Sequence, residues 1–381
     1  MSLVLNEDQQ MLKDAAKDFC SEKSPIEVLR KLRDTKDKNG FDKNLWSKMI
    51  ELGWGGMTFP EAYGGFDFGY GGLGVILEET GRTLVCSPLI STVLLSGSAI
   101  NIGGTEAQKT ELLPAIVSGD LIMAFALEES AKHGPSKTNL VAKKKDGGYS
   151  LSGTKTFVLD GHVADKLIVV ARTSGNAGDE KGISLFVVDA KAKGISIERN
   201  WMVDSRNSAT IIFDDVEVSE AGILGKIDEG FGLLNHVLDI GRIGLAAEML
   251  GSIQHVFEVT LQYLKDRTQF GVAIGAFQAL QHRAAFMYSE IELCKSLVRN
   301  AFSELDGGCD AVALAKIASA TKAKLSETVQ TITNEGVQMH GGIGVTDEFE
   351  LGFYLKRGRV AQQCLGGESF HRDRYATLNG F

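Results

Sequence analysis

The sequence has 381 residues, of which 44% are hydrophobic and 23% charged, the balance of an ordinary globular protein. It carries 40 Lys and Arg against 49 Asp and Glu, and the resulting net charge of −9 argues against a nucleic-acid binder. It has no run of 18 or more apolar residues, so we expect no membrane span.

The cysteines and histidines show no spacing that points to a metal site or a disulfide framework. The five cysteines are scattered and form no CxxC pair, and the seven histidines lack metal-ligand spacing. The first residues, MSLVLNEDQQ, lack the basic and apolar segments of a secretory signal. We therefore expect reduced thiols, no resident metal and a cytoplasmic location.

Residues 1–120 are predicted to form an N-terminal helical domain. Asn6 followed by Gln9 has the pattern of a capping box, and apolar residues then recur at helical spacing. A glycine-rich loop, FPEAYGGFDFGYGG, interrupts the helical pattern. The later helices of this domain are predicted over 42–52 and 73–81, with a short one that begins after Thr105.

Residues 121–226 change to a period of two and are predicted to form a middle β domain. The segments YSLSGTKTFVL, DKLIVVART, GISLFVVDA and ATIIFDDVEV are short and β-branched, and Gly, Asp or Asn bounds them. They lie roughly ten residues apart, which favours an antiparallel sheet or barrel.

Residues 227–381 return to a helical pattern, with apolar residues three and four apart. Long amphipathic runs of this kind pack as an antiparallel bundle. The fold class is therefore α+β: an N-terminal helical domain, a middle antiparallel β domain and a C-terminal four-helix bundle. The C-terminal helices are predicted over 233–265, 277–305, 310–336 and 348–363.

The first informative string is YLKDRTQFG, 263–271, followed by FQALQHRAA, 277–285. Arg267 and Gln269 lie where a long helix ends, and an arginine there offers a fork of donors suited to pyrophosphate. A solvated helix end, where the helix dipole favours cations, would explain Arg267 alone equally well.

The second string is GVQMHGGIGVT, 336–346. Paired glycines at a helix end let a ligand approach the backbone closely. A simple left-handed helix stop is the more ordinary explanation of such a pair. Neither string is specific by itself.

Taken together with FPEAYGG and the order helical, β, helical, the two strings resemble the acyl-CoA dehydrogenase family over essentially the whole chain. These flavoproteins oxidise acyl-CoA thioesters to 2-enoyl-CoA. In the family, the two strings reach across a dimer interface and hold the FAD of a neighbouring subunit. The resemblance assigns that role to Arg267, Gln269, Phe270, Phe277, Gln278, Gln338, Gly341 and Gly342.

The strings that face a chain's own flavin depart from the family pattern. Where the family has Thr-Glu-Pro-x-x-Gly-Ser-Asp, this chain has Leu127 at the Thr position and approximately His133 at the Ser position. The family's Trp-Ile-Thr reads Phe157, Val158, Leu159. Phe157 keeps an aromatic face for the flavin, whereas Leu159 cannot donate a hydrogen bond to it.

The family's catalytic base is also missing. The reaction needs a carboxylate in a dry pocket to remove the proton alpha to the thioester carbonyl. The usual Glu position is Leu365, and the alternative position, just before Arg242, is Gly241. Glu368 and Asp239 lie nearby and are the candidates for a relocated base, although solvated carboxylates are the more ordinary reading of both. The resemblance places His133 and Arg242 on the substrate side.

The strings GGESFHRDRYA, SPLISTVLL and LEETGR resemble the small, base-lacking subunits of two-component acyl-CoA dehydrogenases, such as pimeloyl-CoA dehydrogenase small subunits. The resemblance implies FAD, an acyl-CoA substrate, a homo- or hetero-tetramer with a related subunit and an electron-transfer flavoprotein as acceptor. Two alternatives remain open: a self-sufficient homotetrameric dehydrogenase with a relocated base, and a non-catalytic structural subunit without flavin. Flavin can tolerate the loss of one hydrogen bond, which keeps the first alternative open.

Overall fold

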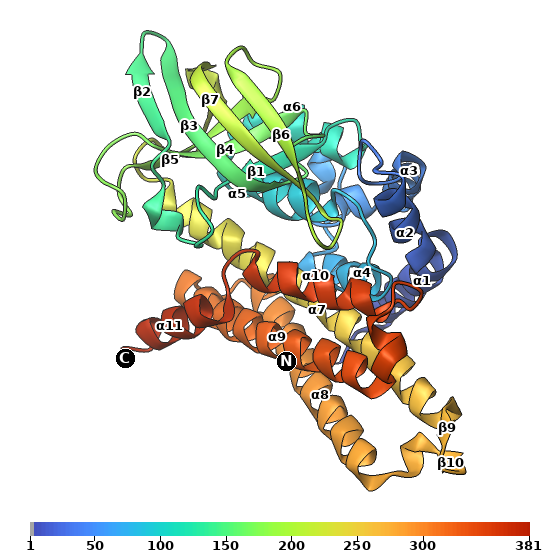
Figure 1. Ribbon diagram of the computed structural model, residues 1–381. Coiled ribbons are helices and arrows are strands. Elements are labelled where there is room, and N and C mark those ends of the chain that lie inside the picture. Colours follow the sequence, from blue (N-terminus) through green and yellow to red (C-terminus); the bar gives the residue numbers. More distant parts are fainter. Residues whose placement is uncertain (1–3) are drawn as a thin grey trace. The chain divides into compact units, whose positions relative to one another are not determined.

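A computed structural model describes residues 4–381, which divide into two units (Figure 1). Unit 1 joins three stretches of the chain: the residues up to Lys31, Tyr70–Val85 and Arg242–Phe381. Unit 2 comprises Leu32–Gly69 and Cys86–Gly241. The predicted order of helical, β and helical regions is confirmed.

Unit 1 is built from long helices. Helix α7 begins in unit 2 and continues into unit 1 from Arg242. A small hairpin follows it, and a short helix, α11, adds a fifth C-terminal helix to the four that the sequence predicts. The elements are α1 (Glu7–Lys23), α2 (Ile26–Asp34, which ends in unit 2), α4 (Tyr70–Arg82), α7 (Phe231–Asp266), β9 (Thr268–Gln269), β10 (Val272–Ala273), α8 (Gln278–Asp306), α9 (Ala311–His340), α10 (Leu351–Gln363) and α11 (Glu368–Leu378).

The helix starts in unit 1 follow from local capping chemistry. At α1 the predicted capping box is confirmed, because Gln9 N donates to Asn6 Oδ1 at 2.7 Å and Asn6 N donates to Gln9 Oε1 at 3.3 Å. Asp310 caps α9 by accepting from two backbone amides. Asp306, the last residue of α8, accepts from the first amides of α4 and so ties the two helices together.

Two glycines let α4 and α7 approach each other closely. A Cβ at Gly81 would lie 2.0 Å from the carbonyl oxygen of Glu248, and one at Gly251 would lie 1.8 Å from that of Glu78. Ser252 Oγ bridges the same crossing by donating to the carbonyl of Gly81 at 2.9 Å. The string LEETGR therefore has a packing role inside unit 1.

Unit 2 combines short helices with one sheet. Its helical elements include a fully buried π-helix that the sequence did not predict. They are α3 (Lys43–Glu51), the π-helix η3 (Leu89–Gly97), α5 (Ser98–Gly103) and α6 (Glu106–Val117). The strands are β1 (Met123–Ala126), β2 (Val141–Lys145), β3 (Gly148–Leu159), β4 (Lys166–Arg172), β5 (Ile183–Asp189), β6 (Ile195–Trp201), β7 (Asn207–Ser219) and β8 (Ile223–Leu224).

The sheet of unit 2 is mixed, which corrects the purely antiparallel arrangement expected from the sequence. Its order is β6-β7-β3-β2-β4-β5-β8, and β1 pairs with β4. β1 and β4 run parallel, as do β2 and β4 where Val141 meets Arg172, whereas the other pairings are antiparallel. The β2–β3 hairpin lies between β1 and β4 in the chain, and this crossover returns β4 in the direction of β1.

Candidate functional site

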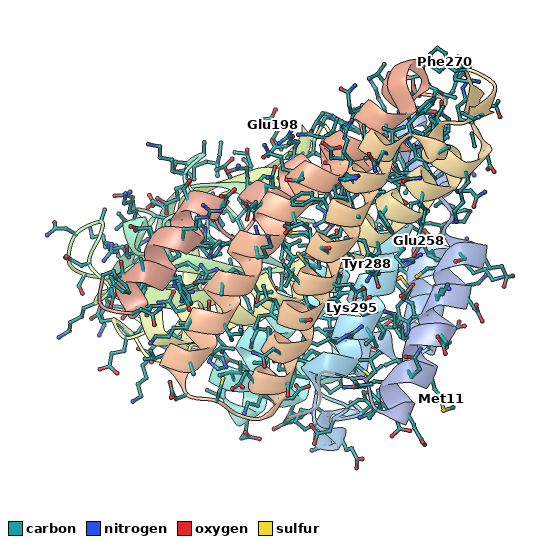
Figure 2. All side chains as sticks on the ribbon, turned by 90° about the horizontal axis from the view of Figure 1, so that it is seen from below. Met11, Glu198, Glu258, Phe270, Tyr288 and Lys295 are labelled. Carbon is teal, nitrogen blue, oxygen red and sulfur yellow. The ribbon has the colours of Figure 1, made fainter. Side chains whose placement is uncertain are left out.

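The eight residues assigned to a neighbour's FAD are all solvent-exposed and all belong to unit 1. Helix α7 ends at Asp266, one residue before Arg267, and the β9–β10 hairpin turns at Phe270, which is 90% exposed (Figure 2). We call this set the exposed cluster. It comprises Arg267, Gln269, Phe270, Phe277, Gln278, Gln338, Gly341 and Gly342.

Stacked rings bring the two strings of the exposed cluster together. Tyr263, one turn before Arg267, stacks on His340 with ring centroids 4.2 Å apart. His340 is the last residue of α9 and precedes Gly341. The end of α7 and the end of α9 are therefore side by side. On the hairpin side, Phe270 and Phe277 meet edge to face at 6.0 Å.

The exposed cluster is open where an anion would approach. Among the residues that the structure describes, none lies within 4 Å of a Cβ built on Gly341 or Gly342. The amide of Gly341 donates to the carbonyl oxygen of Gln338, but the open glycine backbone lets a ligand approach, and the exposed guanidinium of Arg267 is a donor suited to a pyrophosphate. The residues present in this cluster thus suit the phosphate side of a dinucleotide.

The positions that would face the chain's own flavin lie in unit 2 and are mostly buried. Leu127 and Leu159 are both less than a tenth exposed, and Phe157 is half-buried. Lys155, which is fully buried, donates to the carbonyl oxygen of Leu127 at 2.9 Å and to Glu129 Oε1 at 2.7 Å. This pair ties the segment after β1 to β3, so the structure brings the two departing strings together.

Backbone strain marks the same place. Phe157 has a φ of 52° inside β3, at a break in the register between Lys155 and Val158. A bulky residue in the left-handed region costs free energy and persists only where its surroundings enforce it. Here the amide of Thr156 donates to the carbonyl of Glu128 at 2.8 Å, and Lys155 anchors the strand next to the bulge.

His133 is paired with a carboxylate in its loop. Its Nδ1 is within hydrogen-bond distance of Glu128 Oε1, and both side chains are largely buried. Glu128 is the one residue of the family's Thr-Glu-Pro pattern that this chain keeps. The pair is a polar feature at a position where the resemblance implies substrate contact, and its imidazole–carboxylate geometry holds His133 in one orientation.

The usual base position, Leu365, lies in a tight turn between α10 and α11. Its side chain is buried, and its φ is 58°. Its carbonyl oxygen accepts from Arg242 Nε at 3.1 Å and from His371 Nε2 at 3.0 Å. Arg242 and His371 are fully buried, so the predicted substrate residue Arg242 is at least in part engaged with the turn.

The two candidates for a relocated base have different surroundings. Glu368 is the first residue of α11 and forms an ion pair with Arg372 one turn later, at 2.9 Å, with its side chain 34% exposed. Glu368 is thus a partly exposed carboxylate that already has a cationic partner, which is not the dry pocket that a catalytic base needs. Asp239 lies within α7, two residues before Gly241, and is buried.

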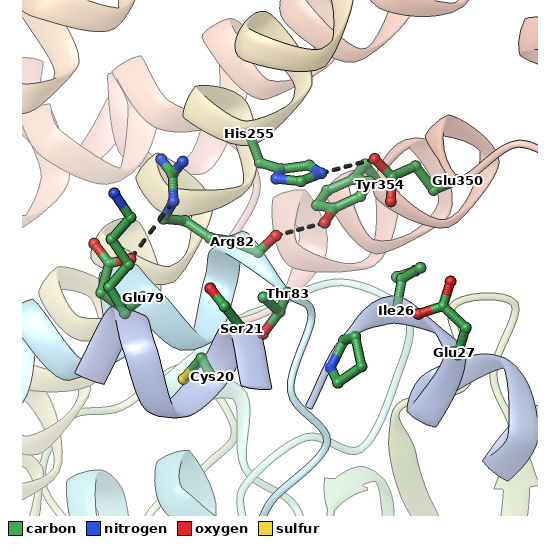
Figure 3. A pocket seen from close by; sticks show the side chains of 12 residues that line it. Cys20, Ser21, Ile26, Glu27, Glu79, Arg82, Thr83, His255, Glu350 and Tyr354 are labelled. Carbon is green, nitrogen blue, oxygen red and sulfur yellow. Dashed lines mark hydrogen bonds and ion pairs between the residues drawn. The ribbon is translucent and has the colours of Figure 1, made fainter. Parts of the chain in front are cut away.

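Unit 1 also holds a polar cavity of about 280 Å³ that the motif analysis did not anticipate (Figure 3). Its charged side chains largely neutralise one another: His255 Nε2 meets Glu350 Oε1 at 2.8 Å, and Arg82 Nε lies 3.5 Å from Glu79. Burial raises the pKa of Glu79, and burial with the nearby Glu79 carboxylate raises the pKa of the Cys20 thiol to about 12. The thiol is therefore not a reactive thiolate at neutral pH.

Two features of residues 4–381 concern membrane-spanning helices and metal sites. No helix in this stretch has both the length and the apolar character needed to cross a membrane. The same stretch contains no grouping of three or more His, Cys, Asp or Glu side chains that could hold a metal ion.

Three family models match the chain. They are described as the acyl-CoA dehydrogenase N-terminal domain, over residues 6–120, the middle domain, over 127–216, and the C-terminal domain, over 228–377.

Among curated proteins, the chain is 32% identical to a short-chain-specific acyl-CoA dehydrogenase of Megasphaera elsdenii, with 95% of each chain covered. Among solved structures, it resembles butyryl-CoA dehydrogenase from Megasphaera elsdenii, with a TM-score of 0.90, 28% identity and full coverage of both chains. It also resembles a chain of the Tcur3481-Tcur3483 steroid ACAD, with a TM-score of 0.87, 31% identity and 98% of each chain covered.

Proposed function

Because this chain belongs to the acyl-CoA dehydrogenase family, we propose that it is one subunit of a tetrameric flavoenzyme that converts an acyl-CoA thioester to the 2-enoyl-CoA. In this proposal its exposed cluster completes the FAD site of a neighbouring chain. A related partner chain supplies the carboxylate that removes the proton. The chain thus acts as the base-lacking subunit of a two-component enzyme.

The observation that carries the proposal is the unequal state of the two flavin-facing regions. The exposed cluster keeps Arg267, three glutamines and two glycines at which a Cβ would meet open space, and all of these residues are solvent-exposed. The region around Leu127 and Leu159 has lost donors and is buried. A donor-rich, exposed hairpin tip is what a site completed by a second chain requires.

FAD, when bound, supplies the acceptor for the hydride that leaves the beta carbon of the acyl chain. The role of this chain's residues is to bind it: the guanidinium of Arg267 suits the pyrophosphate, the open backbone at Gly341 and Gly342 lets it come close, and Gln269 and Gln338 offer further donors. An electron-transfer flavoprotein is the proposed acceptor of the electrons afterwards.

Proton removal is the step that this chain is least equipped to perform. Leu365 and Gly241 offer no carboxylate at either family position. Glu368 is engaged with Arg372, so it is poorly suited to take up a proton in a dry pocket. Asp239 is buried in α7 and remains the candidate for the self-sufficient alternative.

The flavin content of the purified chain tests the proposal. We expect the chain alone to retain little FAD, and its complex with a related, Glu-bearing dehydrogenase chain to hold about one FAD for every two chains. The complex should reduce its flavin with acyl-CoA, whereas this chain loaded with FAD should do so about 10²–10⁴-fold more slowly than a Glu-bearing relative.

Two other results would contradict the proposal. One tightly held FAD per chain with rapid bleaching by acyl-CoA would support the self-sufficient enzyme, and loss of that bleaching in Asp239→Asn or Glu368→Gln, with FAD still bound, would then name the base. No flavin in any assembly would support the purely structural subunit.

A further inference from the structure

Lys322 is a buried cation that no motif singled out. It lies in the middle of α9 with 0% of its surface exposed. Its Nζ donates to the carbonyl oxygens of Ala361 at 3.0 Å, Gln362 at 3.1 Å and Gly366 at 3.1 Å, and to Ser326 Oγ at 3.1 Å. An ammonium has three hydrogens and an uncharged amine only two, so three carbonyl oxygens at this range, which can only accept, suit the ammonium form.

The three carbonyls belong to the end of α10 and the turn after it. The last carbonyls of a helix have no partner within the helix, and a cation is favoured there by the helix dipole. Gln362 strengthens the same end by donating from Nε2 to the carbonyl of Ser326 at 2.7 Å. Burial lowers the pKa of Lys322 to about 7, which shows that desolvation of its charge is costly, and the carbonyl oxygens are the groups that stabilise the charge in this buried place.

A second set of donors holds the turn from its other side. The carbonyl oxygen of Leu365 accepts from Arg242 of α7 and from His371 of α11. Buried side chains from three different helices therefore hold residues 361–366 by hydrogen bonds. These helices, α7, α9 and α11, are labelled in Figure 1.

The backbone of this turn has a strained conformation. Leu365 has a φ of 58° and Gly366 a φ of 104°. A helix stop needs only one left-handed residue, and glycine takes that place without strain. This chain puts a large side chain in the left-handed region immediately before the glycine. Backbone strain of this kind persists only where the surrounding contacts enforce it, and such strained residues are often found at functional sites.

We infer that Lys322 is a positioning residue: by clamping the end of α10, it fixes the backbone at residue 365 and so fixes where the side chain at that position points. The inference rests on the proposed function in one respect, namely that residue 365 occupies the family's base position. The clamp itself is independent of which side chain the turn carries.

Hydrogen–deuterium exchange of the purified protein tests the clamp directly. In Lys322→Met, the amides of residues 364–367 should exchange about 10–100-fold faster, the effect of losing a buried charged hydrogen-bond set. Lys324→Met is the matched control: Lys324 lies two residues further along α9 but pairs with Glu290, so it should leave the turn unchanged. Unchanged exchange in Lys322→Met would overturn the inference.

A second variant keeps the test decisive if Lys322→Met does not fold. Leu365→Gly removes the strained side chain and leaves Lys322 in place. If the clamp holds the turn, the protection of residues 364–367 should persist in this variant. Loss of that protection would show that packing of the leucine holds the turn, and the inference would fall.

Catalysis separates positioning from mere stability. Leu365→Glu is first loaded with FAD, and any gain in the rate of flavin reduction by butyryl-CoA is measured. Adding Lys322→Met should lower that gained rate at least about tenfold, with little change in the flavin content. Retention of the full gain would overturn the positioning role even if exchange rises. If Leu365→Glu gains nothing by itself, the proposed function fails at residue 365, and exchange alone then decides on the clamp.

Discussion

The exposed cluster at the end of α7 and α9 and the β3 region around Leu127, Phe157 and Leu159 differ in nearly every physical property. The first is solvated and rich in donors, and a Cβ on either of its two glycines would meet open space. The second is buried and apolar at two key positions, and a buried Lys155–Glu129 pair holds it. The contrast teaches that the chain offers exposed donors in one region and a buried, largely apolar environment in the other, and the proposed subunit role rests on this difference.

The largest effect is expected at the vacated base position. Leu365→Glu should raise the rate of flavin reduction by acyl-CoA by about 10²–10⁴-fold in the FAD-loaded chain, because a positioned base contributes that much. Stopped-flow bleaching of the flavin measures it. Leu365→Gln is the control for shape and polarity, and equal rates in the Glu and Gln variants would show that residue 365 does not face the substrate.

Asp160 lies directly after β3, and its titration tests whether this end of the strand contributes to the stability of the fold. Burial raises the pKa of its carboxyl to about 6, while Ser91 Oγ donates to it at 2.6 Å. The carboxyl of Asp160 therefore keeps its proton in the native state up to about pH 6, whereas in the unfolded chain it loses the proton near pH 4. Its contribution to the free energy of unfolding is fully present below pH 4 and is lost as the pH rises through 6. It should amount to about 3 kcal/mol at low pH.

Denaturation of the parent and of Asp160→Asn between pH 4 and 7 measures this contribution. The difference in unfolding free energy should shift by about 2 kcal/mol over the window, in the direction that favours the parent at low pH, and the rest of the contribution appears below pH 4. Burial lowers the pKa of the neighbouring His162 to about 4, which gives an opposite slope common to both proteins. A pH-independent difference would contradict the buried acid.

Arg267 tests the outward-facing region. Arg267→Ala should weaken flavin retention in the assembled enzyme by about 1.5–3 kcal/mol, or roughly 10–100-fold, the scale of a charged hydrogen bond lost from a buried contact. The melting temperature of the isolated chain should stay the same, because the side chain is exposed there. Lys265→Ala, an exposed cation at the end of the same helix, is the control. Equal flavin retention in the two variants would exclude Arg267 from the site.

The smallest effect is expected at Gly342. A methyl group there meets no described atom of its own chain within 4 Å, so Gly342→Ala should fold normally. If a ligand approaches that backbone, the methyl group should weaken flavin retention by about 1 kcal/mol, roughly fivefold. Gly352→Ala in α10, where a Cβ also meets open space among residues 4–381, is the control. Equal flavin titrations of both variants would show that no ligand approaches Gly342.

Much of the fold could be predicted from local chemistry. The capping box of Asn6 with Gln9 is predicted and observed, and the helix predicted to begin after Thr105 begins there, with Gln108 completing a capping box that the sequence analysis did not name. Helix α11 was missed because ESFHRDRYATL has little apolar periodicity; the buried His371 and the bond from Arg374 to Ser319 hold it. The parallel pairing of β1 with β4 was missed because it depends on a crossover, not on local pattern.

The site was predictable only where a motif marked it. The two motif strings predict Arg267 and Gly341 as site residues. Their proximity in space follows from the stacking of Tyr263 on His340, a contact between residues far apart in the sequence. Lys322 carried no signal beyond being a lysine in an apolar helix, because its partners lie about forty positions further along the chain. The strain at Leu365 likewise depends on donors from three helices.

A structure of the flavin-loaded assembly, formed with a related Glu-bearing chain, is the measurement that tests the central claim most directly. The account predicts that the guanidinium of Arg267 contacts the pyrophosphate of an FAD whose isoalloxazine is held by the other chain, and that this FAD packs against the backbone of Gly341 and Gly342. An FAD held instead beside Leu127, Phe157 and Leu159 of this same chain, with Arg267 in solvent, would contradict it.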